Sequence, residues 1–255
     1  MADFTELFAT ASSAVEDALG PAEEVDRPVA VRDADTLAGR IDHTVLAADA
    51  TMARIETLCA EAKEHLFASV CVNSRWVPLA AEALTGSPVM VCTVVGFPLG
   101  AMSRRAKAAE AAIAVEEGAD EVDMVLDIGA IKSGDLACAF EDMRAVASAA
   151  GVPVKVILET CLLDDDEKAI ACLLALRSGV AYVKTSTGFS TAGATEADIR
   201  LMRAMVGEAL GVKASGGIRT TDDALKMLAA GADRIGASAS IAIATGAPTG
   251  GPGGY

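Results

Sequence analysis

Short apolar runs rich in β-branched residues alternate along the chain with longer stretches of helical periodicity. The runs recur about every 25–30 residues, which is the spacing of repeated strand–helix units. We expect eight strands, over Ile41–Leu46, Ala68–Asn73, Val89–Gly96, Asp120–Asp127, Val154–Glu159, Ala181–Ser186, Val212–Ser215 and Arg234–Ala237. We expect helices over Arg105–Glu117, Leu136–Ala150, Asp164–Ser178, Glu196–Leu210 and Thr221–Ala230.

Eight strands that are each followed by a helix favour a closed (β/α)8 TIM barrel. An open doubly wound sheet stays an alternative, because periodicity does not show closure. We expect one domain over residues 1–244, in which residues 1–32 form an N-terminal extension of one or two acidic helices outside the barrel. Residues 245–255 are rich in glycine and proline and are expected to form a flexible tail.

Composition and charge narrow the classes of function. Of the 255 residues, 52% are hydrophobic and 4% are aromatic, so mainly aliphatic side chains must fill a sizeable core. The formal net charge of −15 repels nucleic acids and anionic membrane surfaces. The longest apolar run, Pro88–Met102, is too short to span a bilayer. We therefore expect a small-molecule substrate, and an anionic one would need a local site of backbone N–H groups, lysine or arginine.

The cysteines and histidines bear on location and cofactors. The six cysteines show no CxxC spacing and lie in apolar segments, so we expect buried, reduced thiols. The acidic stretch Met1–Glu6 lacks the basic region of a secretory signal, and both features predict a cytoplasmic protein. With only His43 and His65, and with no ligand cluster of metal-binding spacing, we expect neither a metal nor another cofactor.

Two expected strands each carry one lysine inside an apolar or small-residue run, namely Lys184 and Lys213. Lysine is among the residues least often buried, and the loss of solvation lowers the pKa of an ammonium group. A neutral amine can attack a carbonyl carbon and form an imine, so a buried lysine pair points to Schiff-base chemistry. The alternative is a pair of surface lysines near strand ends.

Strand alternation brings two further charged residues to the same interior face. Asp123 and Lys155 should converge with Lys184 and Lys213 at the mouth formed by the C-terminal ends of the strands. One carboxylate among three lysines predicts a site that is cationic on balance, in which a neighbouring ammonium lowers the pKa of the nucleophilic lysine. A structural ion pair explains any one of these residues, but it explains four on consecutive strands less well.

Six segments between about Ile41 and Ser238 resemble the deoxyribose-phosphate aldolase family. They are Ile41–Thr44, Gly96–Gly100, Asp120–Val125, Val154–Thr160, Lys184–Gly188 and Lys213–Thr220. The resemblance implies a class I aldolase, a lyase that reversibly cleaves 2-deoxy-D-ribose 5-phosphate to D-glyceraldehyde 3-phosphate and acetaldehyde. Carried over by position, it implies Lys184 as the Schiff-base nucleophile, Lys213 as the ammonium that lowers its pKa, and Asp123 as the general acid/base.

The resemblance also implies where the phosphate binds. We expect it at the loops after the last three strands, with Gly188, Gly216, Gly217, Arg219, Gly236 and Ser238. Three positions depart from the family pattern. Phe189 and Ala47 stand where members often carry lysine, and Ala239 stands where a second serine is common. These departures bear on the affinity for the substrate, and they leave the catalytic residues unchanged.

Four other residues are candidates for the site, and three of them have two interpretations. Lys155 either supports the proton-transfer network or only pairs with Asp123. Tyr255 is a candidate for proton transfer at the enamine carbon, because some family members fold a C-terminal tyrosine over the site, but a terminal residue often has no role. Cys71 and Asn73 could line the cavity, where Cys71 would pack or be alkylated by aldehyde products.

Three other functions stay open. The first is a different Schiff-base aldolase or transaldolase, which trapping with alternative donors would distinguish. The second is a phosphate-binding barrel that uses the lysines as anchors and performs no chemistry. The third, a structural or partner-binding barrel, explains the interior charges least well. We also expect a homo-oligomer, either a dimer or a tetramer.

Overall fold

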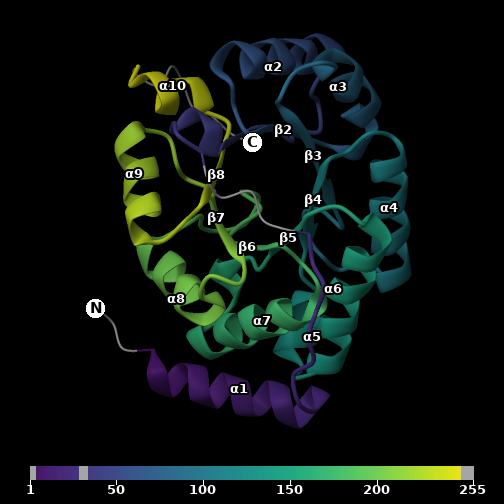
Figure 1. The fold of residues 1–255 in the computed structure, drawn as a ribbon, viewed down its shortest axis with the longest axis vertical. Coiled ribbons are helices and arrows are strands. Elements are labelled where there is room, and N and C mark those ends of the chain that lie inside the picture. Colours follow the sequence, from purple (N-terminus) through teal and green to yellow (C-terminus); the bar gives the residue numbers. More distant parts are fainter. Residues whose placement is uncertain (1–3, 29–33, 248–255) are drawn as a thin grey trace.

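Eight parallel strands form a closed barrel in sequence order, with β8 pairing back onto β1 (Figure 1). The protein is represented by a computed structural model that describes residues 4–28 and 34–247. The strands are β1 (Ile41–Val45), β2 (Ser69–Val72), β3 (Met90–Val95), β4 (Glu121–Val125), β5 (Val154–Ile157), β6 (Tyr182–Lys184), β7 (Gly211–Ser215) and β8 (Arg234–Ala237). Closure confirms the predicted (β/α)8 barrel and excludes the open sheet.

Helices surround the barrel and connect its strands (Figure 1). They are α1 (Thr5–Leu19), α2 (Met52–His65), α3 (Val77–Leu84), α4 (Arg104–Glu116), α5 (Ile128–Lys132), α6 (Leu136–Ala150), α7 (Asp165–Ser178), α8 (Glu196–Val206), α9 (Thr221–Ala230) and α10 (Ser240–Thr245). Four of the five predicted helices match within one residue at each end. The fifth, α8, ends at Val206 rather than at Leu210, because Gly207 leaves the helix with a positive φ of 51°.

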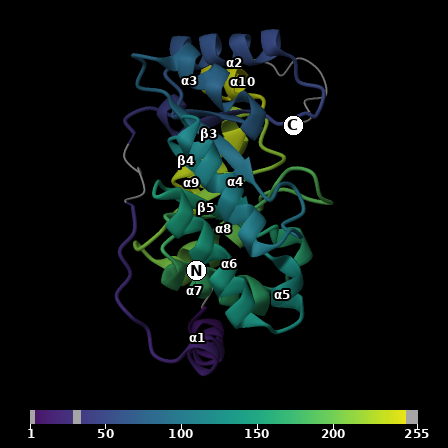
Figure 2. The same cartoon turned by 90° about the vertical axis from the view of Figure 1, so that its right-hand side faces the viewer.

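The N-terminal extension contains one described helix, α1, which packs outside the barrel against α7 and α6. Residues 20–28, which follow α1, run up one side of the molecule (Figure 2). The Arg177 guanidinium at the end of α7 donates to the carbonyls of Gly20 and Pro21, at 2.9 and 2.8 Å. Over residues 20–28 the described chain is therefore attached to the barrel by hydrogen bonds to its backbone, and it forms no second helix there.

The two faces of the strands have opposite character. Outward-facing side chains such as Val70, Val122, Met124 and Val156 are buried under the helices in one apolar core. The interior of such a barrel is usually filled by branched apolar side chains as well. Here much of the interior is charged, and because an unpaired buried charge is costly, these residues mark the site.

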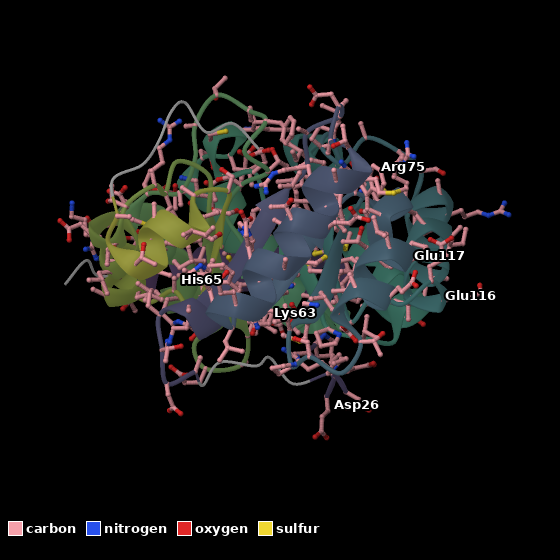
Figure 3. All side chains as sticks on the ribbon, turned by 90° about the horizontal axis from the view of Figure 1, so that it is seen from above. Asp26, Lys63, His65, Arg75, Glu116 and Glu117 are labelled. Carbon is pink, nitrogen blue, oxygen red and sulfur yellow. The ribbon has the colours of Figure 1, made fainter. Side chains whose placement is uncertain are left out.

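Charge on the outside of the molecule has a different setting. Exposed residues such as Asp26, Glu116 and Glu117 project away from the fold, where water solvates them (Figure 3). Among the described helices, none is both long and apolar enough to cross a membrane.

Candidate active site

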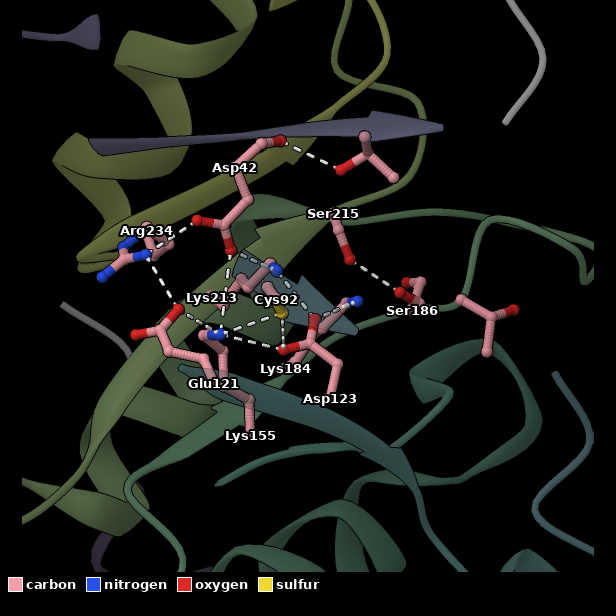
Figure 4. A network of polar contacts seen from close by, with 12 residues as sticks. Asp42, Cys92, Glu121, Asp123, Lys155, Lys184, Ser186, Lys213, Ser215 and Arg234 are labelled. Carbon is pink, nitrogen blue, oxygen red and sulfur yellow. Dashed lines mark hydrogen bonds and ion pairs between the residues drawn. The ribbon is translucent and has the colours of Figure 1, made fainter. Parts of the chain in front are cut away.

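The strand register places the four predicted interior residues side by side. Lys184 and Lys213 are direct partners on β6 and β7, and Asp123 and Lys155 are direct partners on β4 and β5. Their side chains point toward one another inside the barrel (Figure 4). Each of the four residues is at most 3% exposed. The convergence that strand alternation predicts is confirmed, and the alternative of surface lysines is excluded.

Asp123 is the centre of this cluster (Figure 4). Its Oδ2 accepts hydrogen bonds from Lys184 Nζ and Lys213 Nζ, both at 2.7 Å, and its Oδ1 accepts one from Lys155 Nζ at 2.9 Å. Burial alone would raise the pKa of Asp123, but the three ammonium groups hold it well below its usual range. Asp123 is therefore an ionised carboxylate that links the two lysines of the predicted chemistry.

The prediction of one carboxylate among three lysines was wrong, because Asp42, Glu121 and Arg234 also belong to the cluster. Asp42 Oδ2 accepts from Lys213 Nζ at 2.5 Å, and Arg234 Nη1 donates to Asp42 Oδ1 at 2.7 Å. Glu121 Oε2 accepts from Lys155 Nζ at 2.7 Å. Strand parity alone places Glu121 on the same inward face as Asp123, whereas Asp42 and Arg234 come together through the pairing of β8 with β1.

Three of the four cations in the cluster are held in the charged form. Burial alone would lower the pKa of Lys213, but the carboxylates of Asp123 and Asp42 raise it above its ordinary value. The pKa values of Lys155 and Arg234 are raised in the same way by neighbouring carboxylates, against the effect of burial. When the Lys184 amine is neutral, as nucleophilic attack requires, these three cations therefore balance the three carboxylates Asp42, Glu121 and Asp123.

The predicted phosphate loops meet at the same end of the barrel. The backbone of Gly193, in the loop after β6, lies so close to the loop after β7 that a Cβ there would sit 2.2 Å from the carbonyl oxygen of Gly216. Ala194 N donates to this carbonyl at 3.0 Å. Gly188 and Gly217 are exposed at this edge, each with a positive φ, of 87° and 81°. These contacts bring the two glycine loops together above the lysine cluster.

The other predicted phosphate residues have different settings. Arg219 is exposed, and its backbone N–H donates to Asp223 Oδ2 at 3.2 Å. Ser238 is half-buried just before α10. Gly236 is buried within β8, where a Cβ would lie 3.0 Å from Lys213 Cε, so glycine makes room there for the Lys213 side chain. Tyr255 lies outside the described residues, as do residues 248–255 of the predicted tail.

Two residues near the mouth were not among the predicted site residues. Glu159, at the end of β5, accepts hydrogen bonds from the N–H of Thr187 at 3.2 Å and from its hydroxyl, and so holds the start of the loop after β6. Its φ of 55° is unusual for a residue other than glycine. The buried hydroxyl of Ser186 has no partner within the described part of the chain. Both residues follow a strand and keep the parity of an inward lysine, Glu159 with Lys155 and Ser186 with Lys184, which is the signal that could have identified them.

Of the described residues, one group brings three candidate metal ligands together. The sulfurs of Cys71 and Cys92 and a carboxylate oxygen of Asp123 lie within 4.8 Å of one another. Asp123 already contacts three ammonium groups, whose charge opposes a divalent cation there. His43 faces α2 and pairs with Glu61 at 2.8 Å, which fits the predicted structural role.

Comparison with known proteins gives a consistent result. Residues 36–250 match the model of a family described as DeoC/LacD family aldolase. A deoxyribose-phosphate aldolase of Brevibacillus brevis is 58% identical over 214 residues, which are 84% of this chain and 97% of the relative. One of Streptococcus gordonii is 58% identical over 207 residues, covering 81% and 94%. A tetrameric deoxyribose phosphate aldolase of Aeropyrum pernix has a TM-score of 0.76 at 30% identity, covering 95% and 97%.

Proposed function

The chain belongs to the DeoC/LacD family of aldolases, and we propose that its interior lysine cluster catalyses the deoxyribose-phosphate aldolase reaction for which its relatives are named. The chain is a lyase that reversibly cleaves 2-deoxy-D-ribose 5-phosphate into D-glyceraldehyde 3-phosphate and acetaldehyde. The roles proposed for the residues rest mainly on one observation, namely that Asp123 Oδ2 contacts both Lys184 Nζ and Lys213 Nζ, at 2.7 Å each.

The reaction begins at Lys184. Its neutral amine attacks the aldehyde carbon C1 of the open-chain sugar, and the resulting carbinolamine loses water to form a protonated imine. Asp123, an ionised carboxylate in contact with Lys184, accepts the proton that the lysine must lose. Lys213 is held protonated by Asp123 and Asp42, so it can supply a proton to the departing water.

Cleavage follows from the imine. A base removes the proton of the C3 hydroxyl, the C2–C3 bond breaks, and its electron pair moves into the protonated imine to give an enamine. We assign this base to Asp123, acting through a water molecule, because it is the carboxylate in contact with Lys184. Protonation of the enamine at C2 and hydrolysis of the imine release acetaldehyde and restore Lys184. Proton transfer by a positioned group contributes roughly 10²–10⁴-fold to the rate.

The glycine loops above the cluster provide the phosphate site. Gly188 and Gly217 lie at the exposed edge of the mouth, and backbone N–H groups of such loops bind phosphate in many barrels. Gly216 contributes through its close packing against Gly193, while Arg219 and Ser238 lie at the rim of the same loops. The unpartnered Ser186 hydroxyl, on the same strand face as Lys184, is the best placed partner for a substrate hydroxyl.

The remaining roles are supporting. Lys155 contacts Asp123 Oδ1, whereas Lys184 contacts Oδ2, so Lys155 helps to fix the orientation of the carboxylate. Tyr255 is retained as a candidate for proton transfer at the enamine carbon. Residues 1–244 are taken as one catalytic domain, with an extension over 1–32 and a tail over 245–255. A reducing, cytoplasmic location suits the six free cysteines, and the tetrameric relative supports a homo-oligomer.

A direct assay tests this function. Incubation with 2-deoxy-D-ribose 5-phosphate should release acetaldehyde and D-glyceraldehyde 3-phosphate in equal amounts. Borohydride should inactivate the enzyme in the presence of acetaldehyde, but not in the presence of dihydroxyacetone or pyruvate. Inactivation with one of the other donors would instead assign a different Schiff-base aldolase. Binding of the sugar phosphate without products or trapping would assign the binding barrel.

A further inference from the structure

Two cysteines that the aldolase reaction does not use lie next to its proton-transfer residues. Cys71 on β2 and Cys92 on β3 are direct register partners, and both side chains face the barrel interior. They are fully buried, and with Leu46 and Val94 they form an apolar wall opposite the charged strands. Both are free thiols in this structure.

The positions of the two thiols suit a disulfide. Neighbouring strands lie about 4.8 Å apart, and a disulfide requires Cα atoms roughly 4.4–6.8 Å apart. The two sulfur atoms already lie within 4.8 Å of each other, so bond formation needs only a modest approach. We propose that Cys71 and Cys92 form a reversible disulfide when a peroxide enters the barrel, and that this bond lowers the proposed aldolase activity.

A peroxide can reach these thiols by the route that the substrate takes. One carboxylate oxygen of Asp123 lies within 4.8 Å of the Cys71 sulfur, while Asp123 Oδ2 lies 2.7 Å from Lys184 Nζ. The aldehyde must reach Lys184, which is 3% exposed. Hydrogen peroxide is smaller than acetaldehyde, so a passage that admits the aldehyde also admits the oxidant.

The two cysteines have distinct chemical tasks. Hydrogen bonding with Cys92 lowers the pKa of Cys71, against the effect of burial, whereas burial raises the pKa of Cys92 well above its ordinary value. Because the thiolate is the nucleophile, Cys71 attacks the peroxide and becomes a sulfenic acid, releasing one water. The Cys92 thiol then displaces a second water and closes the disulfide. Two thiols lose two electrons in total, and one peroxide is reduced to two waters.

The bond would disturb Asp123 directly. In the reduced form the Cys92 thiol donates to Asp123 Oδ1 at 3.2 Å, and Lys155 Nζ lies 3.5 Å from the same sulfur. A disulfide removes the thiol proton and draws the sulfur toward Cys71, to about 2.04 Å. Asp123 then loses a donor and shifts, and because a misplacement of about 1 Å can cost up to 10²-fold in rate, we expect a loss of about tenfold.

The test uses the intact reduced enzyme and hydrogen peroxide. After treatment, free thiols are alkylated, and the protein is digested without reduction and analysed by mass spectrometry. We expect a peptide pair linked through Cys71 and Cys92, two hydrogen atoms lighter than the separate peptides. Activity should fall as the linked pair accumulates, and a phosphine reductant should restore it. The mass measurement does not depend on which reaction the enzyme catalyses, so its failure is distinct from failure of the proposed function.

Two variants distinguish the effect of the Cys71–Cys92 disulfide from general oxidation. For each variant, the activity after peroxide treatment is compared with the activity of the same untreated variant. In Cys92→Ala no linked pair can form. The part of the activity loss that a reductant reverses should therefore disappear. Cys138→Ser, which changes an exposed thiol on α6, should respond to peroxide as the wild type does.

Three results would overturn the proposal. The first is no Cys71–Cys92 link at a peroxide dose that fully oxidises Cys138. The second is a link that leaves activity unchanged. The third is a link from Cys92 to Lys155 in place of Cys71.

Discussion

Replacing Lys184 with arginine should abolish the aldolase reaction while preserving the fold. Arginine keeps a positive charge next to Asp123 and can keep the ion pair that Lys184 makes at 2.7 Å. A guanidinium stays protonated and does not attack a carbonyl carbon, so no imine can form. Loss of a covalent nucleophile costs on the order of 10⁴-fold or more in kcat, which a coupled assay for D-glyceraldehyde 3-phosphate measures.

The matched control is Lys226→Arg, which makes the same exchange at an exposed position on α9 and should retain full activity. Binding of D-glyceraldehyde 3-phosphate to Lys184→Arg should persist, because the phosphate loops are unchanged. If this variant keeps kcat within about tenfold of the wild type, a different residue is the nucleophile.

The second large effect is expected for Asp123→Asn. The amide cannot accept the proton of the C3 hydroxyl, so we expect kcat to fall roughly 10²–10⁴-fold. It also leaves the ammonium groups of Lys155 and Lys213 with one buried carboxylate fewer, and unpairing a buried charge costs about 3–5 kcal/mol in the free energy of unfolding. Steady-state kinetics and urea unfolding measure the two effects, with the exposed Asp222→Asn as the control.

The loss of folding stability at acid pH should be smaller in the Asp123→Asn variant than in the wild type. In the folded protein the pKa of Asp123 lies well below its ordinary value of 3.8, so the ionised carboxylate stabilises the fold above about pH 4. This contribution is lost as the pH falls through the lower, folded pKa. Asp123→Asn should therefore lose less stability than the wild type between about pH 6 and about pH 3 in urea unfolding. An equal or larger loss would show that the pKa of Asp123 is not lowered in the folded state.

The pKa of Lys213 is shifted upward, in the direction opposite to the shift of Asp123. The folded pKa of Lys213 is raised above its ordinary value of 10.5, so its contribution is complete below that pH and is lost as the pH rises beyond it. Between about pH 4 and about pH 10, the interior network should therefore contribute a nearly constant stability to the fold.

Strand parity accounts for most of what could be predicted from the sequence. In a strand, alternate side chains share one face, so a lysine within an apolar run already places Lys184 and Lys213 in the interior. Closure of the barrel could not be deduced in this way. It depends on the pairing of β8 with β1, which joins residues far apart in the chain. That pairing is also what brings Asp42 into contact with Arg234 and Lys213, so the cluster was predicted as more cationic than it is.

Roles that depend on close approach were also beyond the sequence. Gly236 was assigned to a phosphate loop, yet it lies within β8 and its backbone packs against the Lys213 side chain, which only the register of β7 and β8 places there. The contact of Glu159 with Thr187 joins the ends of two strands and depends on a backbone conformation that residues other than glycine seldom adopt. A site that needs a given residue type on the inward face of a strand could therefore be predicted from the sequence, whereas contacts between loops could not.

The most direct test of the account is to identify the residue that forms the imine. Wild-type enzyme is treated with acetaldehyde and borohydride, digested, and mapped by peptide mass spectrometry. We predict a single ethyl adduct on Lys184, which is absent from Lys184→Arg. An adduct on Lys155 or Lys213, or one equally strong in Lys184→Arg, would contradict the assignment of Lys184 as the nucleophile.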